Sequence, residues 1–156
     1  MIGDIVLQRR SGIVGYFVSW FTRSEWVHCG VVDADNNIVH VDWQGKHFTP
    51  IAEWSDVVVL TPIQPITPGD AFHLDFVLHK EPVQGYSFWN AVKSWFWKSS
   101  DDDKPTGKRY QCASFVSAMY RRIGIDLVPN RSDDTTQPQD FLTSPELTAK
   151  ENGHGY

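Results

Sequence analysis

Residues 110–124 constrain the fold of this chain more than any other stretch. Cys112 stands where a polar, charged segment gives way to apolar residues that recur at helical spacing. These residues, which predict the buried face of a helix, are Phe115, Val116, Met119 and Ile123. Arg121 and Arg122 occupy the expected last turn and Gly124 the expected end, in keeping with the helix dipole and with C-terminal capping. The sequence therefore predicts a helix with Cys112 in its first turn.

The first turn of a helix is a favourable place for a reactive thiol. Unpaired N–H groups and the positive end of the helix dipole lie there, and both favour a thiolate over a thiol. A nucleophilic cysteine needs such a position, although a lone cysteine is more commonly a small buried core residue. The hypothesis that Cys112 is a nucleophile therefore depends on the rest of the chain.

The composition limits what the protein can bind. Its 156 residues, of which 41% are hydrophobic, suit one domain with a core of its own. A net charge of −5 argues against nucleic acid as a partner. Two cysteines, Cys29 and Cys112, are too few for a disulfide scaffold, and no Cys-x-x-Cys or His-Glu-x-x-His spacing indicates zinc. We therefore expect neither a metal nor another cofactor.

The N-terminal residues give no indication of a secretory signal. Residues 1–4 lead directly into a predicted strand, without a basic region followed by an apolar core. Delivery by a phage particle, delivery by a secretion system and a cytoplasmic location all remain open. Residues 13–21 are apolar but shorter than a membrane span, so we expect a short buried or interfacial helix there. Membrane contact through this segment is the less favoured interpretation.

Alternating and β-branched apolar runs predict a small antiparallel sheet in the first half of the chain. The predicted strands are residues 4–7, 26–32, 38–43, 46–49 and 57–60. Further along, the periodicity becomes helical near residues 68–78 and 87–96, before the Cys112 helix. A sheet followed by helices indicates an α+β fold. We assign one domain to residues 1–145 and a flexible tail to residues 146–156.

A nucleophilic cysteine requires a base, and the chain has six histidines that could supply it. They are His28, His40, His47, His73, His79 and His154. His154 lies close to the end of the sequence, where a fixed role is not expected. His73 and His79 fall in the predicted helix that begins near residue 68, where a solvated histidine is the default. The histidines of the sheet are therefore the better candidates.

His28 and His40 lie on predicted strands that follow one another in the chain. An unpaired imidazole inside the apolar strand of His28 would be costly, so we expect a partner for it. A short turn at residues 33–37 joins the strands, and both rings can therefore lie on one sheet face. With the Cys112 helix packed across that face, Cys112, His28 and His40 form a row. Strand alternation points Cys29 to the opposite face, which predicts an inert core thiol.

Three segments resemble one known family. Residues 111–125, which begin Gln-Cys-Ala-Ser-Phe-Val and end Gly-Ile, resemble the nucleophile helix of NlpC-type papain-like cysteine peptidases. In these cell-wall hydrolases Asp-Cys-Ser-Gly-Phe-Val is typical. Residues 3–6 and 26–32 resemble the opening strand and the His-x-Gly-Ile strand of the circularly permuted branch, which includes lecithin–retinol acyltransferase-like enzymes. The likeness covers residues 3–45 and 110–140.

The resemblance implies a single papain-like domain of the permuted type and acyl transfer through a thioester. Cys112 matches the nucleophile and His28 the base, and His40 matches the third polar residue, which orients the base. Gln111 stands where the family has Asp or Asn, and Ala-Ser follows the cysteine in place of Ser-Gly. These departures concern substrate contacts and the oxyanion hole, while the nucleophile itself is present.

The function that the resemblance implies is that of a monomeric thiol hydrolase. Its substrate is expected to be an amide bond in bacterial peptidoglycan stem peptides. A lipid-directed acyl hydrolase or acyltransferase is the first alternative, although such enzymes favour Asn-Cys-Glu-His, which residues 111–114 lack. A non-catalytic binding module that retained the fold is the second alternative, and Gln111 is its best support.

Overall fold

A six-stranded antiparallel sheet forms the centre of the molecule. The computed structural model describes residues 1–9, 25–42, 44–83, 111–129 and 131–150. Within them the strand order is β4-β3-β2-β1-β5-β6. The strands are β1 (Ile5–Arg9), β2 (Trp26–Val32), β3 (Asn37–Asp42), β4 (Gly45–Pro50), β5 (Val57–Pro62) and β6 (Leu147–Ala149). Five of these strands lie where the sequence predicts them, with ends that differ by one or two residues.

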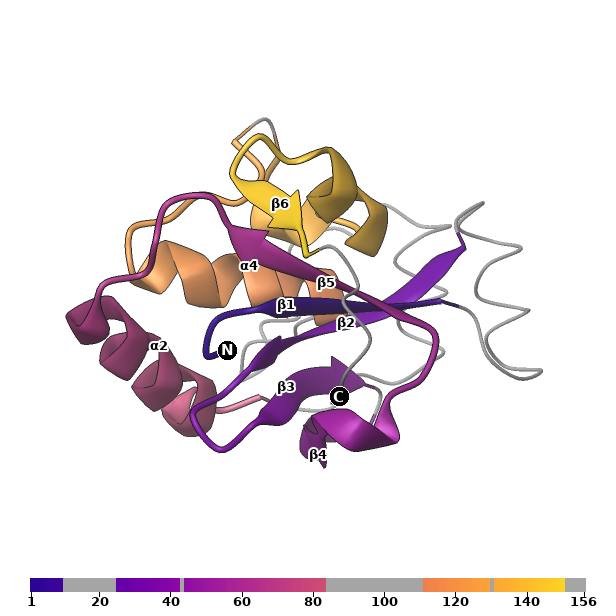
Figure 1. Ribbon diagram of the computed structural model, residues 1–156, viewed down its shortest axis with the longest axis horizontal. Helices are drawn as coiled ribbons and strands as arrows, with labels where there is room; N and C mark the ends of the chain where they lie inside the picture. Colours follow the sequence, from indigo (N-terminus) through magenta and orange to yellow (C-terminus); the bar gives the residue numbers. More distant parts are fainter. Residues whose placement is uncertain (10–24, 43, 84–110, 130, 151–156) are drawn as a thin grey trace, which may run out of the picture.

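Two α-helices accompany the sheet in the described residues, α2 (Pro68–Lys80) and α4 (Cys112–Arg122). Figure 1 shows α4 behind the sheet and α2 at one end of it. Short 3₁₀ helices complete the elements, namely η1 (Ile51–Glu53), η2 (Asp133–Thr135) and η3 (Pro138–Thr143). An antiparallel sheet packed against helices in a single small domain confirms the predicted α+β class. The helices predicted near residues 13–21 and 87–96 lie outside the described residues.

Strand alternation divides the buried side chains between two faces of the sheet. The helix face, which packs against α4 and α2, carries Ile5, Leu7, Cys29, Val31, Val39 and Val41. The outer face carries Val6, Val32, Ile38 and Val59, with Ile51 and Trp54 packed over them. Because β2 is buried on both faces, each of its side chains can contribute to a core or to a site.

The start and end of α4 agree with the sequence. The helix begins at Cys112 and gives way to Gly124, whose φ of +80° lies in the left-handed region that favours glycine. Phe115, Val116 and Met119 are fully buried against the sheet. Each such side chain stabilises the fold by roughly 1.5–3 kcal/mol relative to an exposed one. The helix is thus held by its apolar face.

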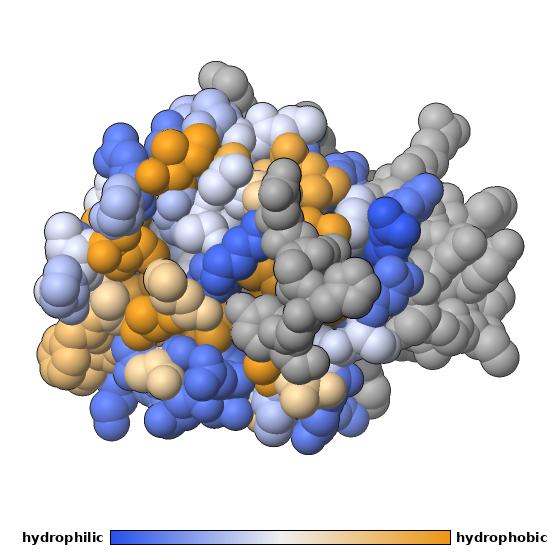
Figure 2. All heavy atoms as spheres, viewed as in Figure 1, coloured by the Kyte–Doolittle hydropathy of each residue, from blue (hydrophilic) through white to orange (hydrophobic). Residues whose placement is uncertain are grey.

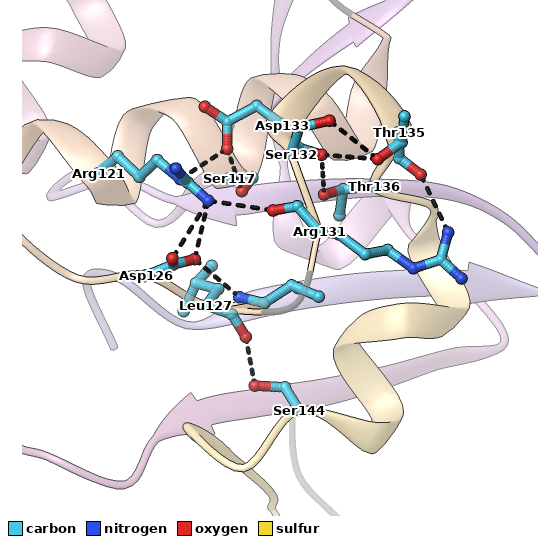
Figure 3. Close-up of polar contacts among 11 residues, drawn as sticks. Ser117, Arg121, Asp126, Leu127, Arg131, Ser132, Asp133, Thr135, Thr136 and Ser144 are labelled. Carbon is cyan, nitrogen blue, oxygen red and sulfur yellow. Dashed lines mark hydrogen bonds and ion pairs between the residues drawn. The ribbon is translucent and has the colours of Figure 1, made fainter.

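A polar network fixes the segment that follows α4 (Figure 3). Arg121 binds the Asp126 carboxylate with both N···O distances at 3.1 Å, and its Nε lies 2.9 Å from Asp133. Asp133 also accepts a 2.6 Å hydrogen bond from Ser117, one turn earlier in α4. The network links the helix to η2, so the C-terminal half of α4 is anchored on its polar side as well.

The sheet extends past the boundary that we predicted for the domain. β6 pairs with β5, and the Lys150 N–H donates to the Val59 carbonyl at 2.9 Å. The Lys150 ammonium lies 2.7 Å from buried Asp4, which also accepts a hydrogen bond from Thr61. Placing the end of the domain at residue 145 was therefore wrong, because residues up to 150 are part of the sheet. Residues 151–156 of the predicted tail lie outside the described residues.

Candidate active site

Cys112 occupies the first turn of α4, as predicted. The Gln111 N–H donates to the Ser114 hydroxyl at 2.8 Å, and this hydroxyl donates to the Gln111 carbonyl at 2.9 Å. Phe115 closes the first helical hydrogen bond to the same carbonyl. Ser114 is buried, and its two hydrogen bonds to Gln111 fix the turn that carries the cysteine.

The two sheet histidines that we predicted as partners are in direct contact. His28 Nε2 lies 2.8 Å from His40 Nδ1, and the ring planes are nearly perpendicular at 89°. The register pairs Gly30 with His40, so His28 and His40 project from the same face of the hairpin. The expected pairing of these residues is therefore present in the structure.

Gly30 makes this contact sterically possible. A Cβ atom at Gly30 would lie 2.8 Å from the Val39 carbonyl oxygen and 2.5 Å from Ile38 Cγ2. It would also lie 3.0 Å from the Cβ atom of His40. Only glycine lets β3 approach β2 this closely, and the close approach brings His40 to His28.

The remaining nitrogen of His40 binds Thr49 in β4, with Nε2 and Oγ1 2.9 Å apart. The pKa of His40 is lowered to about 4, chiefly because the ring is buried, and next because of the charges of His28 and His47. The Asp42 carboxylate opposes this shift. His40 is therefore neutral at pH 7, with one ring nitrogen donating and the other accepting.

Trp54 covers both histidine rings. Its indole is stacked on His28, with centroids 5.4 Å apart, and meets His40 edge-on at 5.2 Å. It follows η1 and is partly buried in the core of the outer face. Neither Trp54 nor Thr49 was singled out from the sequence, because only the fold brings η1 and β4 next to His28 and His40.

His47 continues the histidine cluster toward solvent. Its ring is stacked on that of His40 at 5.4 Å, and its Nε2 lies 2.9 Å from Asp42. Both side chains of this second pair are about one-third exposed. A row of polar side chains therefore runs along the sheet from His28 through His40 to His47. The row ends at the partly exposed pair of His47 and Asp42.

The position of α4 differs from the prediction. We expected the Cys112 helix to cover the face that carries the histidines, whereas α4 packs on the helix face with Cys29 and Val31. Alternation does place Cys29 and His28 on opposite faces of β2, but both reach Cys112. The predicted opposite orientation of Cys29 and His28 is present, but the expectation that Cys29 faces away from the Cys112 helix was wrong.

The surroundings of Cys112 favour the thiolate. The pKa of Cys112 is held well below its ordinary value, first by the hydrogen bond from the Cys29 side chain. Burial opposes the shift, whereas the hydrogen bond and charge of His28 support it. Burial raises the pKa of the Cys29 thiol, so Cys29 is the partner that keeps its proton and donates it.

The described residues contain neither a cluster of metal ligands nor a helix that could cross a membrane. No three His, Cys, Asp or Glu side chains among them are arranged to hold a metal ion. None of the helices seen in these parts of the chain has the length and apolar character needed to cross a membrane.

The fold and this cluster define an α+β protein with a cysteine at a helix start beside a histidine pair. No family model matches the chain, and no curated protein matches it. Among solved structures it is similar to the metalloprotein yiiX from Escherichia coli O157:H7, which carries the description DUF1105. The TM-score is 0.65 at 18% identity, over 97% of this chain and 96% of that one. At this identity the likeness shows a shared fold along nearly the whole chain.

Proposed function

We propose that the protein is a cysteine hydrolase of the permuted NlpC type that cleaves an amide bond in peptidoglycan stem peptides. The observation that carries the proposal is the chain of contacts from Cys112 through His28 to His40. A depressed thiol pKa, an adjacent imidazole and a group that orients the imidazole are the requirements for thiolate catalysis.

The hydrogen bonds of the two histidines fit the role of a base with its orienting partner. Because Nε2 of His28 binds His40, Nδ1 is the ring nitrogen left for the Cys112 proton. Neutral His40 accepts from His28 through Nδ1 and donates from Nε2 to Thr49. This arrangement keeps both ring nitrogens of a protonated His28 engaged.

The reaction proceeds in two stages. The Cys112 thiolate attacks the carbonyl carbon of the amide, and the first-turn N–H of Cys112, which has no intrahelical acceptor, stabilises the oxyanion. His28 then protonates the leaving amine as the C–N bond breaks. Water, deprotonated by His28, hydrolyses the thioester and restores the thiolate.

The choice of substrate rests on the resemblance to the wall hydrolases. Phe115 and Val116 after the cysteine, and Gly124-Ile125 at the helix end, match that group, and the Glu-His that follows the cysteine of the acyltransferases is missing. These positions support a peptide amide more than a lipid ester as the substrate.

A lipid-directed activity is the second candidate, because one surface favours it. Phe72 and Phe76 of α2 are 76% and 52% exposed. Figure 2 shows hydrophobic surface at the end of the molecule that α2 occupies. Two exposed aromatic side chains one helical turn apart are suited to contact with an apolar surface.

Incubation with intact sacculi and, separately, with phospholipid vesicles distinguishes the candidates. Cleavage of stem peptides releases new amino groups from sacculi and gives muropeptides that mass spectrometry identifies. A Cys112→Ser variant, which keeps the size of the side chain, should release none. Fatty acid released from vesicles, with sacculi unchanged, would support the lipid candidate. If neither substrate changes and both proteins bind sacculi equally, the protein is a binding module.

A further inference from the structure

Cys29 is a buried nucleophilic group that the proposed hydrolysis does not use. It is 0% exposed on the helix face of β2, whereas Cys112 is only partly buried at the start of α4. Cys112 packs against the core cluster that contains Cys29, and the two side chains are near enough to shift each other's pKa. In redox-sensitive proteins an accessible cysteine is oxidised first, and a neighbouring resolving cysteine then forms a disulfide with it. Cys112 is suited to the first role and Cys29 to the second.

Both thiols are held by rigid elements. β2 is paired on its two sides, with β1 and with β3, so Cys29 has little freedom. The first turn of α4 is fixed by the reciprocal hydrogen bonds between Gln111 and Ser114. An S–S bond of about 2.05 Å requires the two sulfur atoms to approach each other across the packed interface of β2 and α4.

We propose that Cys29 is the resolving thiol for an oxidised Cys112, so that peroxide converts the pair into an intramolecular disulfide. The proposal concerns sulfur chemistry and holds whether or not the protein hydrolyses peptidoglycan. A disulfide at Cys112 removes the thiolate, and reduction restores it, so the site becomes sensitive to peroxide in a reversible way.

The oxidation takes place in two steps, with hydrogen peroxide as the oxidant. The Cys112 thiolate attacks one peroxide oxygen, the O–O bond breaks, and Cys112 sulfenic acid and hydroxide form. Cys29 then gives its proton to the hydroxide and attacks the sulfenic sulfur. The S–S bond forms as the S–O bond breaks, and the sulfenic oxygen leaves as hydroxide, which the buffer protonates to water. The two sulfur atoms together have then lost two electrons to peroxide.

Mass spectrometry of peroxide-treated protein tests this proposal. Reduced wild-type protein treated with equimolar peroxide and then alkylated should lose two hydrogens in mass. After digestion it should yield a peptide that joins Cys29 to Cys112, and dithiothreitol should restore both thiols. A disulfide between two chains would contradict the proposal, as would Cys112 sulfinic acid in the absence of the linked peptide.

Two variants separate the roles of the cysteines. In Cys29→Ala, Cys112 should be trapped by dimedone as sulfenic acid and should proceed to sulfinic acid, with loss of recovery by dithiothreitol. In Cys112→Ser, Cys29 should stay reduced, because it is buried and protonated. Equal recovery of Cys112 in wild type and Cys29→Ala would overturn the proposal. Should Cys29→Ala fail to fold, the wild-type linked peptide alone decides the matter.

Discussion

His28 Nε2 and His40 Nδ1 lie 2.8 Å apart, so the two imidazoles share a single hydrogen. When His28 carries a proton on each nitrogen, His40 must be neutral in order to accept from it. Two cations at this distance would repel each other, and burial of His40 adds to this cost. The pair can therefore carry a cation on His28 only while His40 is neutral. The two histidines therefore have unequal roles in the proposed reaction, His28 as the base and His40 as the acceptor that orients it.

Removal of His28 should reduce activity far more than removal of the His40 ring. His28→Ala removes the proton acceptor and should lower kcat by roughly 10²–10⁴, the usual contribution of a general base. His40→Gln keeps an acceptor near His28 and should retain part of the rate. The measurement is kcat on muropeptides for both variants, with circular dichroism as the control for folding. Near wild-type turnover by His28→Ala would rule out its assignment as the base.

The reactivity of Cys112 should persist at pH values at which an ordinary thiol is protonated. Its pKa is lowered first by the Cys29 hydrogen bond and further by His28. Iodoacetamide at neutral pH should therefore label Cys112 before Cys29. In Cys29→Ala and in His28→Ala, the midpoint of the alkylation–pH profile should move upward. A profile that stays in place in both variants would show that neither contact stabilises the thiolate.

The stability of the fold should decline on mild acidification because of His40. Its pKa falls from 6.5 to about 4 on folding, so between these values the unfolded chain binds more protons than the folded one. Stability then rises with pH across this window and is lost as pH falls through it. Urea midpoints measured between pH 6.5 and 4 should show this slope in wild type and a smaller one in His40→Gln. Equal slopes would exclude His40 as its source.

A methyl group at Gly30 should disrupt the hairpin that pairs the histidines. Gly30→Ala places a Cβ atom against the Val39 carbonyl and should cost about 1–3 kcal/mol, as overpacking usually does. It should also weaken the contact between His28 and His40. Gly69→Ala is the matched control, because the nearest atom to its Cβ is 3.9 Å away. Thermal unfolding of both variants measures the difference, and equal values would contradict the steric argument.

Loss of the Trp54 indole should expose the histidine pair to water. Burial is the main reason for the low pKa of His40, so in Trp54→Ala this pKa should rise from about 4 toward 6.5. Trp54→Phe, which keeps an aromatic ring, should shift it less. NMR titration of the His40 ring protons gives both values. An unchanged pKa in Trp54→Ala would mean that other groups exclude water from His40.

Local patterns were sufficient for those parts of the structure that depend on neighbours in the sequence. β2 has the predicted bounds because its apolar run is long and flanked by polar residues. The contact of His28 with His40 follows from one short hairpin. β6 was missed because three residues, Leu147–Ala149, carry no pattern of their own and form a strand only by pairing with β5.

The error over Cys29 has a physical reason. Both faces of β2 are buried, so alternation separates His28 from Cys29 without indicating which face a helix covers. Thr49 and Trp54 were missed for a related reason. Their roles arise where β4 and η1 fold back over the hairpin, and no motif marks that position.

β2, β3 and β4 follow one another in the chain and also lie side by side in the sheet. This arrangement affects the order in which the site assembles. These strands pair with their sequence neighbours, so their contacts are local and form early in folding. Docking of α4 on β2 joins parts of the chain that are far apart, and such contacts form late. On the ribosome the segment that carries both histidines emerges before Cys112 has been synthesised. Cys112 gains the neighbours that lower its pKa, Cys29 and His28, only when α4 docks on β2.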